Sequence, residues 1–388
     1  MPDWSRRSLL QALALGAALP GMRAQEGEPV DLDYRHASPQ ALERWRDLKY
    51  GLRIHWGIYS IWAGGPESWP LTRHDRSWQG RYCRLYRTWD PDGFDADAWT
   101  DMMVRCGFRF FDFTAKHHDG FSLYDTRTRV NRRFIYSGPN AGGIEACELA
   151  YSMMETPFRR DVVQALIEAG RRRGLAPGLY FSHIDWYDAD FRMDSWNPNR
   201  DKNYSPQTDP EGWARFTRRH RAQIRELLTR YGPLCELSLD MSLPPDAWPA
   251  MKETIKMARR LQPDCLFRNR GIGTYGDYHT PENWVPDSPR SKESPLPWQV
   301  IHTLGRYMSY DPDPSAYRSG AWIVSNLADI VAKGGLFMVG IGPDGNGRFH
   351  PKALEAVEEA GAWLKINGEA IYGTRPWTYW QEGEAVRF

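Results

Sequence analysis

The sequence predicts an α/β fold of the (β/α)8 type, a TIM barrel, on three observations. Short apolar runs of strand length alternate along the chain with longer segments whose apolar residues recur at helical spacing. Five successive apolar runs end in titratable or polar side chains. The chain has 388 residues, which is enough for one large α/β domain. Because the carboxyl ends of all barrel strands meet on one face, we expect these polar ends to line a common pocket.

The predicted strands share this change from apolar to polar residues. In chain order, the range 51–57 ends in His55, and the range 108–121 ends in His117, His118 and Asp119. The range 175–186 ends in Ser182, His183 and Asp185, and the range 235–242 ends in Asp240. The range 265–271 ends in Arg268, Asn269 and Arg270. An open doubly wound sheet would also place a site at the carboxyl ends of its strands. That alternative lacks a glycine-rich phosphate-binding turn after the first strand, where this chain reads His55-Trp56-Gly57.

Helices are predicted between and after these strands. Their ranges are 97–106, 161–173, 213–231, 248–261, 321–332 and 353–365. Asp161 is a candidate N-cap, and Arg171-Arg172-Arg173 followed by Gly174 suits the negative end of a helix and a left-handed cap. Pro351 fits the first turn of the last helix.

Composition narrows the classes of partner. The chain carries 50 Lys and Arg against 49 Asp and Glu, so we expect neither a nucleic acid nor an acidic membrane as partner. Its 18 Trp and 19 Tyr suit flat surfaces on which sugar rings stack, although part of this set must belong to the core. Five Cys at irregular spacing form neither a zinc pattern nor a dense disulfide framework.

Residues 1–24 are predicted to be a targeting segment. Arg6-Arg7 is a twin-arginine pattern, and the apolar run that follows, Leu9–Leu19, is too short to span a membrane. Ala24 is a plausible cleavage point. We therefore expect a bacterial protein exported to the periplasm or secreted, with its catalytic domain at residues 25–377.

Three acidic residues are candidates for chemistry. Asp240 ends an apolar strand, and a carboxylate held ionised there is a competent nucleophile; capping of the following loop is the alternative role. Glu282, in a loop with nearby aromatic residues, is a candidate general acid with a raised pKa, or else a solvated loop residue. Glu67, near Trp69, is better placed to accept a hydrogen bond from a hydroxyl.

A metal site is the rival interpretation of His55, His117, His118 and Asp185. Metal-dependent barrel hydrolases carry His-x-His at the end of the first strand, and this chain does not. Neighbouring residues on a strand also point to opposite sides, so His117 and His118 face one ion only if the loop turns between them. We expect no metal and no cofactor.

Several motifs together resemble the α-L-fucosidases of glycoside hydrolase family 29, from about Leu48 to Trp377. They are GLRIHWGIYS, WDPDGFDADAW, FTAKHHDGF, GLYFS, the LDM around Asp240, GDYHTPEN, GGLFMVGIGPDGNG and WLKINGEAIYGTRPW. The resemblance implies a (β/α)8-like barrel followed by a C-terminal β-sandwich. Since the chain ends at Phe388, we expect that sandwich to be largely absent or truncated, with 378–388 as its start or as a tail.

The resemblance also implies an activity and roles for residues. Members release terminal α-L-fucose with retention; Asp240 matches the nucleophile and Glu282 the acid/base residue. Residues matching those that grip the fucose are His55, His117, His118 and Arg270, and with less similarity Tyr180, Glu67 and Trp69. Two departures are Ser68, inserted between Glu67 and Trp69, and the Leu-Ser-Leu run before Asp240.

The expected function is hydrolysis of terminal α-L-fucose from fucosylated oligosaccharides or glycoconjugates through a covalent fucosyl-Asp240 intermediate. One alternative is a related deoxysugar or galactoside hydrolase on the same barrel. The other, from a different class, is a non-catalytic sugar-binding barrel.

Overall fold

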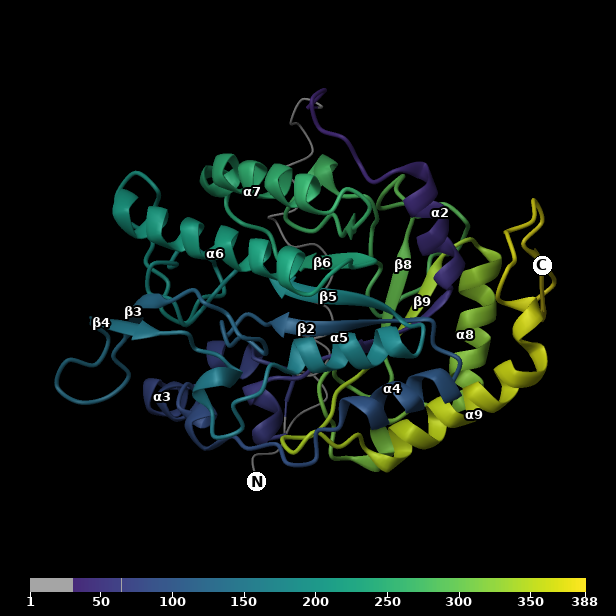
Figure 1. Cartoon of the computed structure of the whole chain (residues 1–388), viewed down its shortest axis with the longest axis horizontal. Coiled ribbons are helices and arrows are strands. Elements are labelled where there is room, and N and C mark those ends of the chain that lie inside the picture. The colour runs from purple at the N-terminus through teal and green to yellow at the C-terminus, as the bar shows by residue number, and fades with distance from the viewer. Residues whose placement is uncertain (1–30, 64) are drawn as a thin grey trace.

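A curled, seven-stranded parallel sheet organises the structure, a computed structural model that describes residues 31–63 and 65–388 (Figure 1). Neighbouring strands follow the order β7-β6-β5-β2-β1-β9-β8. The strands are β1 (Tyr50–Ile54), β2 (Phe110–Lys116), β5 (Ala176–Ser182), β6 (Glu236–Asp240), β7 (Leu266–Phe267), β8 (Gln299–Thr303) and β9 (Leu336–Ile341). Asp240 therefore ends the fourth sheet strand in chain order.

Residues 277–283 fill the gap between β7 and β8. On one side the amide of Asn269 donates to the carbonyl of Tyr278 at 3.0 Å. On the other side the amide of Gln299 donates to the carbonyl of His279 at 3.0 Å, and Glu282 pairs in parallel with Ile301. We call this segment the eighth stave; together with the curled seven-stranded sheet it is consistent with the predicted (β/α)8-like barrel.

Helices surround the barrel and pack in neighbouring pairs, with α6 and α7 along one side of β5 and β6 in Figure 1. They are α2 (Pro39–Leu48), α3 (Arg76–Tyr82), α4 (Ala96–Arg105), α5 (Val162–Arg172), α6 (Pro210–Arg230), α7 (Trp248–Leu261), α8 (Gly320–Ala332) and α9 (Pro351–Asn367). Short 3-10 helices join them: η2 (Ile58–Ile61), η3 (Trp69–Thr72), η4 (Leu85–Thr88), η5 (Met153–Glu155), η6 (Pro245–Ala247), η7 (Gly273–Tyr275), η8 (Pro314–Ala316) and η9 (Gly368–Ala370).

The predicted helices correspond to α4 to α9, with α7 matching to the residue. Asp161 caps α5 by accepting a hydrogen bond from the amide of Gln164, and Gly174 beyond it has a φ of 76°. The sequence did not predict α2, α3, β8 or β9, nor the hairpin of β3 (Val130–Phe134) and β4 (Ile144–Leu149). That hairpin extends from the left of the barrel in Figure 1.

The amino-terminal end of the barrel interior holds charged residues as well as apolar ones. Arg53 pairs with Asp112 at 2.6 Å between Nη2 and Oδ2. Glu236 accepts hydrogen bonds from Trp45 Nε1 at 2.7 Å and from Gln299 Nε2 at 3.0 Å. Burial and the nearby Asp112 raise the pKa of Glu236 to about 8, and burial raises the pKa of Asp112. We call Arg53, Asp112 and Glu236 the floor.

The last residues form the two-stranded hairpin β10 (Gln381–Glu382) and β11 (Val386–Arg387). It packs on α8, where Arg387 Nε lies 2.6 Å from Asp329 Oδ1. That 378–388 begins a further β domain stays a prediction, and the predicted targeting segment 1–24 lies outside the described residues.

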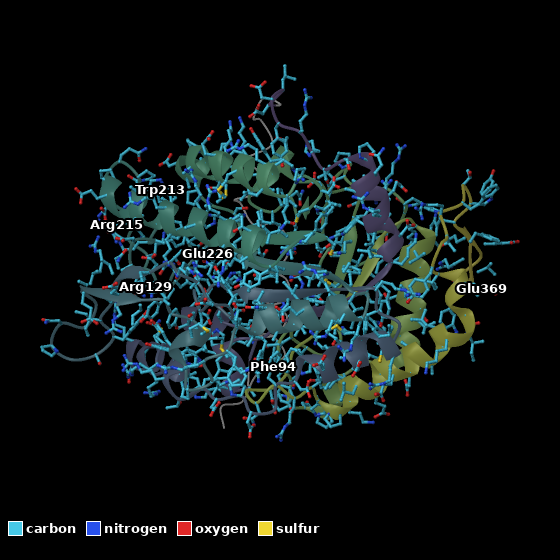
Figure 2. All side chains as sticks on the ribbon, viewed as in Figure 1. Phe94, Arg129, Trp213, Arg215, Glu226 and Glu369 are labelled. Carbon is cyan, nitrogen blue, oxygen red and sulfur yellow. The ribbon has the colours of Figure 1, made fainter. Side chains whose placement is uncertain are left out.

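Other sequence expectations concern the surface and the thiols. The five cysteines, all of them in the described part, are free thiols, and three of them are buried. None of the helices within 31–63 and 65–388 is long and apolar enough to cross a bilayer. Charged side chains cover the outside, with Arg129 and Glu369 at opposite ends of the molecule in Figure 2.

Candidate active site

The carboxyl ends of the strands bring the predicted site residues together. We call this end of the barrel the mouth; its predicted residues are His55, Glu67, Trp69, His117, His118, Tyr180, Asp240, Arg270 and Glu282. They come from β5 and β6, from the segments that follow β1, β2 and β7, and from the eighth stave. Residues from the whole length of the chain therefore meet because parallel strands share a direction.

Asp240 is the last residue of β6 and only 8% exposed. Its Oδ2 accepts a hydrogen bond from the Tyr180 hydroxyl at 2.6 Å. Its Oδ1 lies 3.0 Å from Arg270 Nη1 and 3.7 Å from Arg268 Nη1. Burial raises the pKa of Asp240, but the charges of Arg268 and Arg270 outweigh it and hold that pKa well below its usual value. Asp240 is therefore an ionised carboxylate in a dry setting.

Glu282 shares the same guanidinium from the opposite side. Its Oε2 lies 2.6 Å from Arg270 Nη2 and 3.5 Å from Arg268 Nη2. The expectation of a raised pKa is wrong: burial raises it, but Arg270 and Arg268 together lower it below its usual value. The sequence argument considered only the aromatic neighbours in the loop, whereas the fold places two cations against the carboxylate.

Three histidines line the mouth. The pairing of β2 with β5 shifts register between Thr114 and Lys116, immediately before His117 and His118. Their ring centroids lie 4.0 Å apart, and His55 lies 5.4 Å from His117. Burial lowers the pKa of all three, that of His118 to about 4, so the rings are neutral near pH 7. His55 Nδ1 is buried without a hydrogen-bond partner.

The segment after β1 adds a buried carboxyl group and an aromatic wall. Glu67 has a φ of 37°, and its Oε1 accepts a hydrogen bond from the Ser309 amide at 2.7 Å. Burial raises the pKa of Glu67 to about 7. The inserted Ser68 places its Oγ 2.5 Å from His117 Nδ1. The Trp69 ring lies 5.1 Å from the His118 ring, so this segment packs directly on the histidines.

Asp185, a ligand in the metal interpretation, is committed to other partners. Its Oδ2 lies 2.6 Å from Arg219 Nη1 and 3.5 Å from Lys116 Nζ. Gly120, with a φ of 80°, turns the chain against it, because an added Cβ there would lie 2.1 Å from Asp185 Oδ1. Within 31–63 and 65–388, no group of three or more His, Cys, Asp or Glu side chains could hold a metal ion.

The sequence matches the family model described as alpha-L-fucosidase over residues 22–369. The chain belongs to the α-L-fucosidase family. Human tissue alpha-L-fucosidase is 26% identical over 401 residues, which cover 95% of this chain and 77% of the relative. Alpha-L-fucosidase from Dictyostelium discoideum is 25% identical over 365 residues, covering 85% of this chain and 71% of the relative. As a member of this family the protein is a glycoside hydrolase.

Solved structures agree with this α-L-fucosidase fold. Alpha-L-fucosidase isoenzyme 1 from Paenibacillus thiaminolyticus matches with a TM-score of 0.74 and 27% identity, over 88% of this chain and 80% of that one. An alpha-L-fucosidase from Bacteroides thetaiotaomicron shares the fold with a TM-score of 0.73 at 23% identity, over 89% of this chain and 78% of that one.

Sequence reasoning named Arg268 as a strand-end residue and Ser68 as an insertion, but it assigned neither of them a contact in the site. Arg268 contacts both Asp240 and Glu282, and Ser68 contacts His117. The contacts of Arg268 could have been inferred, because residues two apart on a strand share a face and Arg270 was already a candidate. No local signal marks Ser68, since its partner comes from another strand.

Proposed function

We propose that this chain hydrolyses terminal α-L-fucosides of fucosylated oligosaccharides or glycoconjugates with retention, by double displacement. The observation that carries the proposal is the pair of Asp240 and Glu282 on one guanidinium, that of Arg270, at the barrel mouth. Retaining glycosidases need two carboxyl groups facing one anomeric centre, at roughly 5–5.5 Å from each other.

In the first step an Oδ atom of Asp240 attacks the anomeric carbon, and the bond from that carbon to the glycosidic oxygen breaks. The leaving oxygen takes a proton from Glu282, which must first take it up from solvent because its carboxyl group is ionised in the free enzyme. In the second step Glu282 removes a proton from water, whose oxygen attacks the same carbon and frees Asp240. The Bacteroides relative supports this scheme, because its structure is that of a trapped covalent intermediate with 2-fluoro-fucosyl fluoride.

The surroundings of Asp240 suit nucleophilic attack. Tyr180 and Arg270 hold its two oxygens separately, which fixes the plane of the carboxylate. Neutral His55, with its unpartnered Nδ1, is well suited to a sugar hydroxyl. The neighbouring His117, His118 and Trp69 extend this polar and aromatic lining.

A second assignment of the proton donor rests on one observation. Glu67 has a pKa of about 7 and carries a proton at mildly acid pH, whereas Glu282 is ionised there in the free enzyme. A general acid must be protonated, so activity is lost as pH rises through its pKa. With Glu67 as donor, kcat/KM stays high up to about pH 7; with Glu282, it declines from well below that pH.

Azide trapping tests all three carboxyl groups on 2,4-dinitrophenyl α-L-fucoside, whose leaving group needs no acid. In Asp240→Gly, azide replaces the nucleophile and should give the β-fucosyl azide. In a variant lacking the acid/base residue, azide replaces the second-step water and should give the α-fucosyl azide. We expect the α product from Glu282→Ala and no azide effect from Glu67→Ala; the reverse would transfer the acid/base role to Glu67.

The two alternative functions, a related deoxysugar or galactoside hydrolase and a non-catalytic sugar-binding barrel, can be distinguished by a panel of substrates. A panel of 4-nitrophenyl α-L-fucoside, the matching galactoside and fucosylated oligosaccharides should show fucoside turnover as the fastest. Preference for the galactoside would favour a related hydrolase. Binding of fucose without turnover of any of these substrates would indicate a sugar-binding barrel.

We propose further that the protein is exported to the periplasm or secreted. The twin arginines at residues 6 and 7 and the apolar run after them support this proposal. In a bacterial host, replacing both arginines by lysine should retain the protein in the cytoplasm. Unchanged export of that variant would contradict a twin-arginine route.

A further inference from the structure

Two buried histidines behind the mouth take no part in the proposed reaction. His183 follows β5 and His220 lies on α6, and neither is more than 3% exposed. Their ring centroids lie 5.5 Å apart, with His183 on the side of the active site. Burying two imidazoles calls for a reason beyond packing, because each must satisfy its ring nitrogens.

His183 joins the two segments that carry the catalytic carboxylate and its arginine. Its backbone amide donates to the carbonyl of Asp240 at 3.0 Å. Its ring Nε2 lies 3.3 Å from the carbonyl oxygen of Arg270. A carbonyl only accepts, so the ring proton of His183 must sit on Nε2 for this contact to be a hydrogen bond.

His220 satisfies the other ring nitrogen of His183 in that arrangement. Nδ1 of His183 lies 3.2 Å from Nε2 of His220. Burial lowers the pKa of His183 to about 4 and that of His220 well below its usual value, so both rings are neutral. With its proton on Nε2, His183 accepts at Nδ1, and His220 donates.

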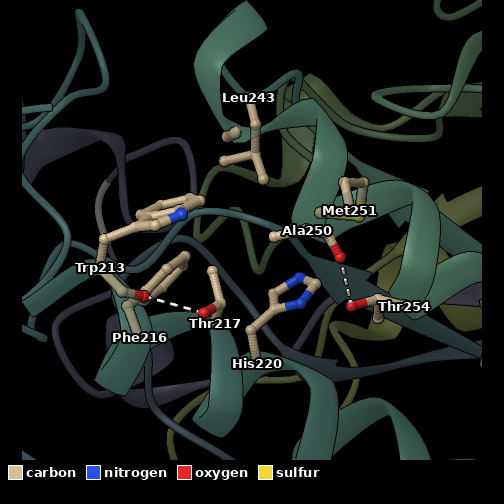
Figure 3. Close-up of a pocket in the computed structure, with 9 residues that line it drawn as sticks. Trp213, Phe216, Thr217, His220, Leu243, Ala250, Met251 and Thr254 are labelled. Carbon is tan, nitrogen blue, oxygen red and sulfur yellow. Dashed lines mark hydrogen bonds between the residues drawn. The ribbon is translucent and has the colours of Figure 1, made fainter. Parts of the chain in front are cut away.

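Packing holds His220 in place. It lines a cavity of about 10 Å³ between α6 and α7, among Phe216, Thr217, Ala250 and Thr254 (Figure 3). A cavity of this size is at the lower limit for a single water molecule. Little water can therefore compete for the hydrogen bond between the two rings.

The joined segments both turn sharply just past the site. Met241, which follows Asp240, has a φ of 67°, and Gly271, which follows Arg270, has a φ of 72°. A Cβ added at Gly271 would lie 2.3 Å from the Met241 carbonyl oxygen and 2.7 Å from Cδ2 of His183. Left-handed backbone at a residue such as Met241 persists only where its surroundings enforce it.

We propose that His183, oriented by His220, is a positioning residue that fixes Arg270 and thereby the spacing of Asp240 and Glu282. The guanidinium of Arg270 contacts both carboxylates, so a shift of its backbone changes their geometry. A displacement of the order of 1 Å at reacting groups can cost up to about a hundredfold in rate. The inference rests on the proposed double displacement.

Two near-isosteric variants of His183 distinguish the contribution of its Nε2 from that of its Nδ1. The amide nitrogen of His183→Gln reaches the place of Nε2 and can still donate to Arg270, whereas that of His183→Asn reaches only the place of Nδ1. We expect kcat per active site to stay within about threefold of wild type in His183→Gln. In His183→Asn it should fall by about tenfold, with KM changed less than threefold, and in His220→Leu by an intermediate factor.

The assay measures turnover of 4-nitrophenyl α-L-fucoside. The concentration of active sites is determined by titration with 2-fluoro-fucosyl fluoride, so kcat is corrected for any enzyme that fails to fold. His302→Gln is a matched control, because His302 is a half-buried histidine on another barrel strand, β8, where its Nδ1 lies 3.3 Å from the carbonyl oxygen of Thr303. Equal kcat in His183→Gln and His183→Asn would overturn the positioning role. A wild-type enzyme without fucoside turnover would instead overturn the proposed function.

Discussion

The mouth and the floor of this barrel each hold two carboxyl groups in different charge states; three of the four are buried, and the side chain of Glu282 at the mouth is 38% exposed. At the mouth, Arg268 and Arg270 contact Asp240 and Glu282, and both carboxyl groups have a lowered pKa. At the floor, Asp112 and Glu236 have Arg53 as their cation, and both have a raised pKa.

Direct contacts with cations decide this difference. Removal from water raises the pKa of all four carboxyl groups. At the floor only Arg53, among the described cations, makes a contact, at 2.6 Å from Asp112, and the more distant charge of Arg268 does not overcome burial, so the pair holds a proton. At the mouth both Arg268 and Arg270 contact the carboxylates and keep them ionised. The same barrel interior therefore holds an ionised pair of carboxyl groups at one end and a pair that keeps a proton at the other.

The largest effect is expected at the mouth, from Asp240→Ala. Removing the proposed nucleophile should lower kcat on 4-nitrophenyl α-L-fucoside by about 10⁴-fold or more. Glu236→Gln is the matched control, since it changes a buried carboxyl group of the same strand, β6, away from the mouth. Comparable activity in Asp240→Ala and the control would remove the distinction between mouth and floor.

The next effect is on stability and tests the floor. Arg53→Met removes the cation that pairs with Asp112 and donates to Ser238 at 2.8 Å. Breaking a buried ion pair in this way costs about 3–5 kcal/mol of unfolding free energy. Urea unfolding followed by tryptophan fluorescence measures it. A loss below about 1 kcal/mol would mean that the floor carboxyls need no cation.

Removing one cation from the mouth should raise the pKa of its carboxyl groups, as burial does at the floor. In Arg270→Met, Asp240 and Glu282 keep only Arg268, so the pKa of each should rise. We expect kcat/KM to fall about a hundredfold, with the acid limb of the pH profile moved to higher pH because Asp240 must ionise. An acid limb at the wild-type position would show that Arg270 does not set the charge of the pair.

The smallest effect is expected from Glu236→Gln, and it depends on pH. The folded pKa of Glu236, about 8, is above the ordinary value, so its contribution to stability is full below the ordinary pKa and is lost as pH rises through about 8. Gln imitates the protonated acid. The variant should therefore differ little from wild type at pH 5 and gain in relative Tm towards pH 9; a constant difference would contradict a raised pKa.

Local patterns in the sequence determined a large part of the fold. Apolar periodicity and end signals placed α4 to α9, and the change from apolar to polar placed Asp240 at the end of a strand. Such signals act within one turn of helix or one strand, so they can be recognised in the local sequence without the rest of the chain. The eighth stave could not be predicted from the sequence, because Tyr278–Glu282 takes up strand-like pairing only where it lies between β7 and β8.

The sequence by itself determined which side chains reach the mouth, because parallel strands carry their ends to one face. The tertiary structure alone decided their charge. Glu282 is ionised because Arg268 and Arg270 face it and lower its pKa. Glu67 is protonated at mildly acid pH because burial raises its pKa to about 7. A pKa depends on burial and on charges within a few ångströms, and those neighbours come from distant parts of the chain.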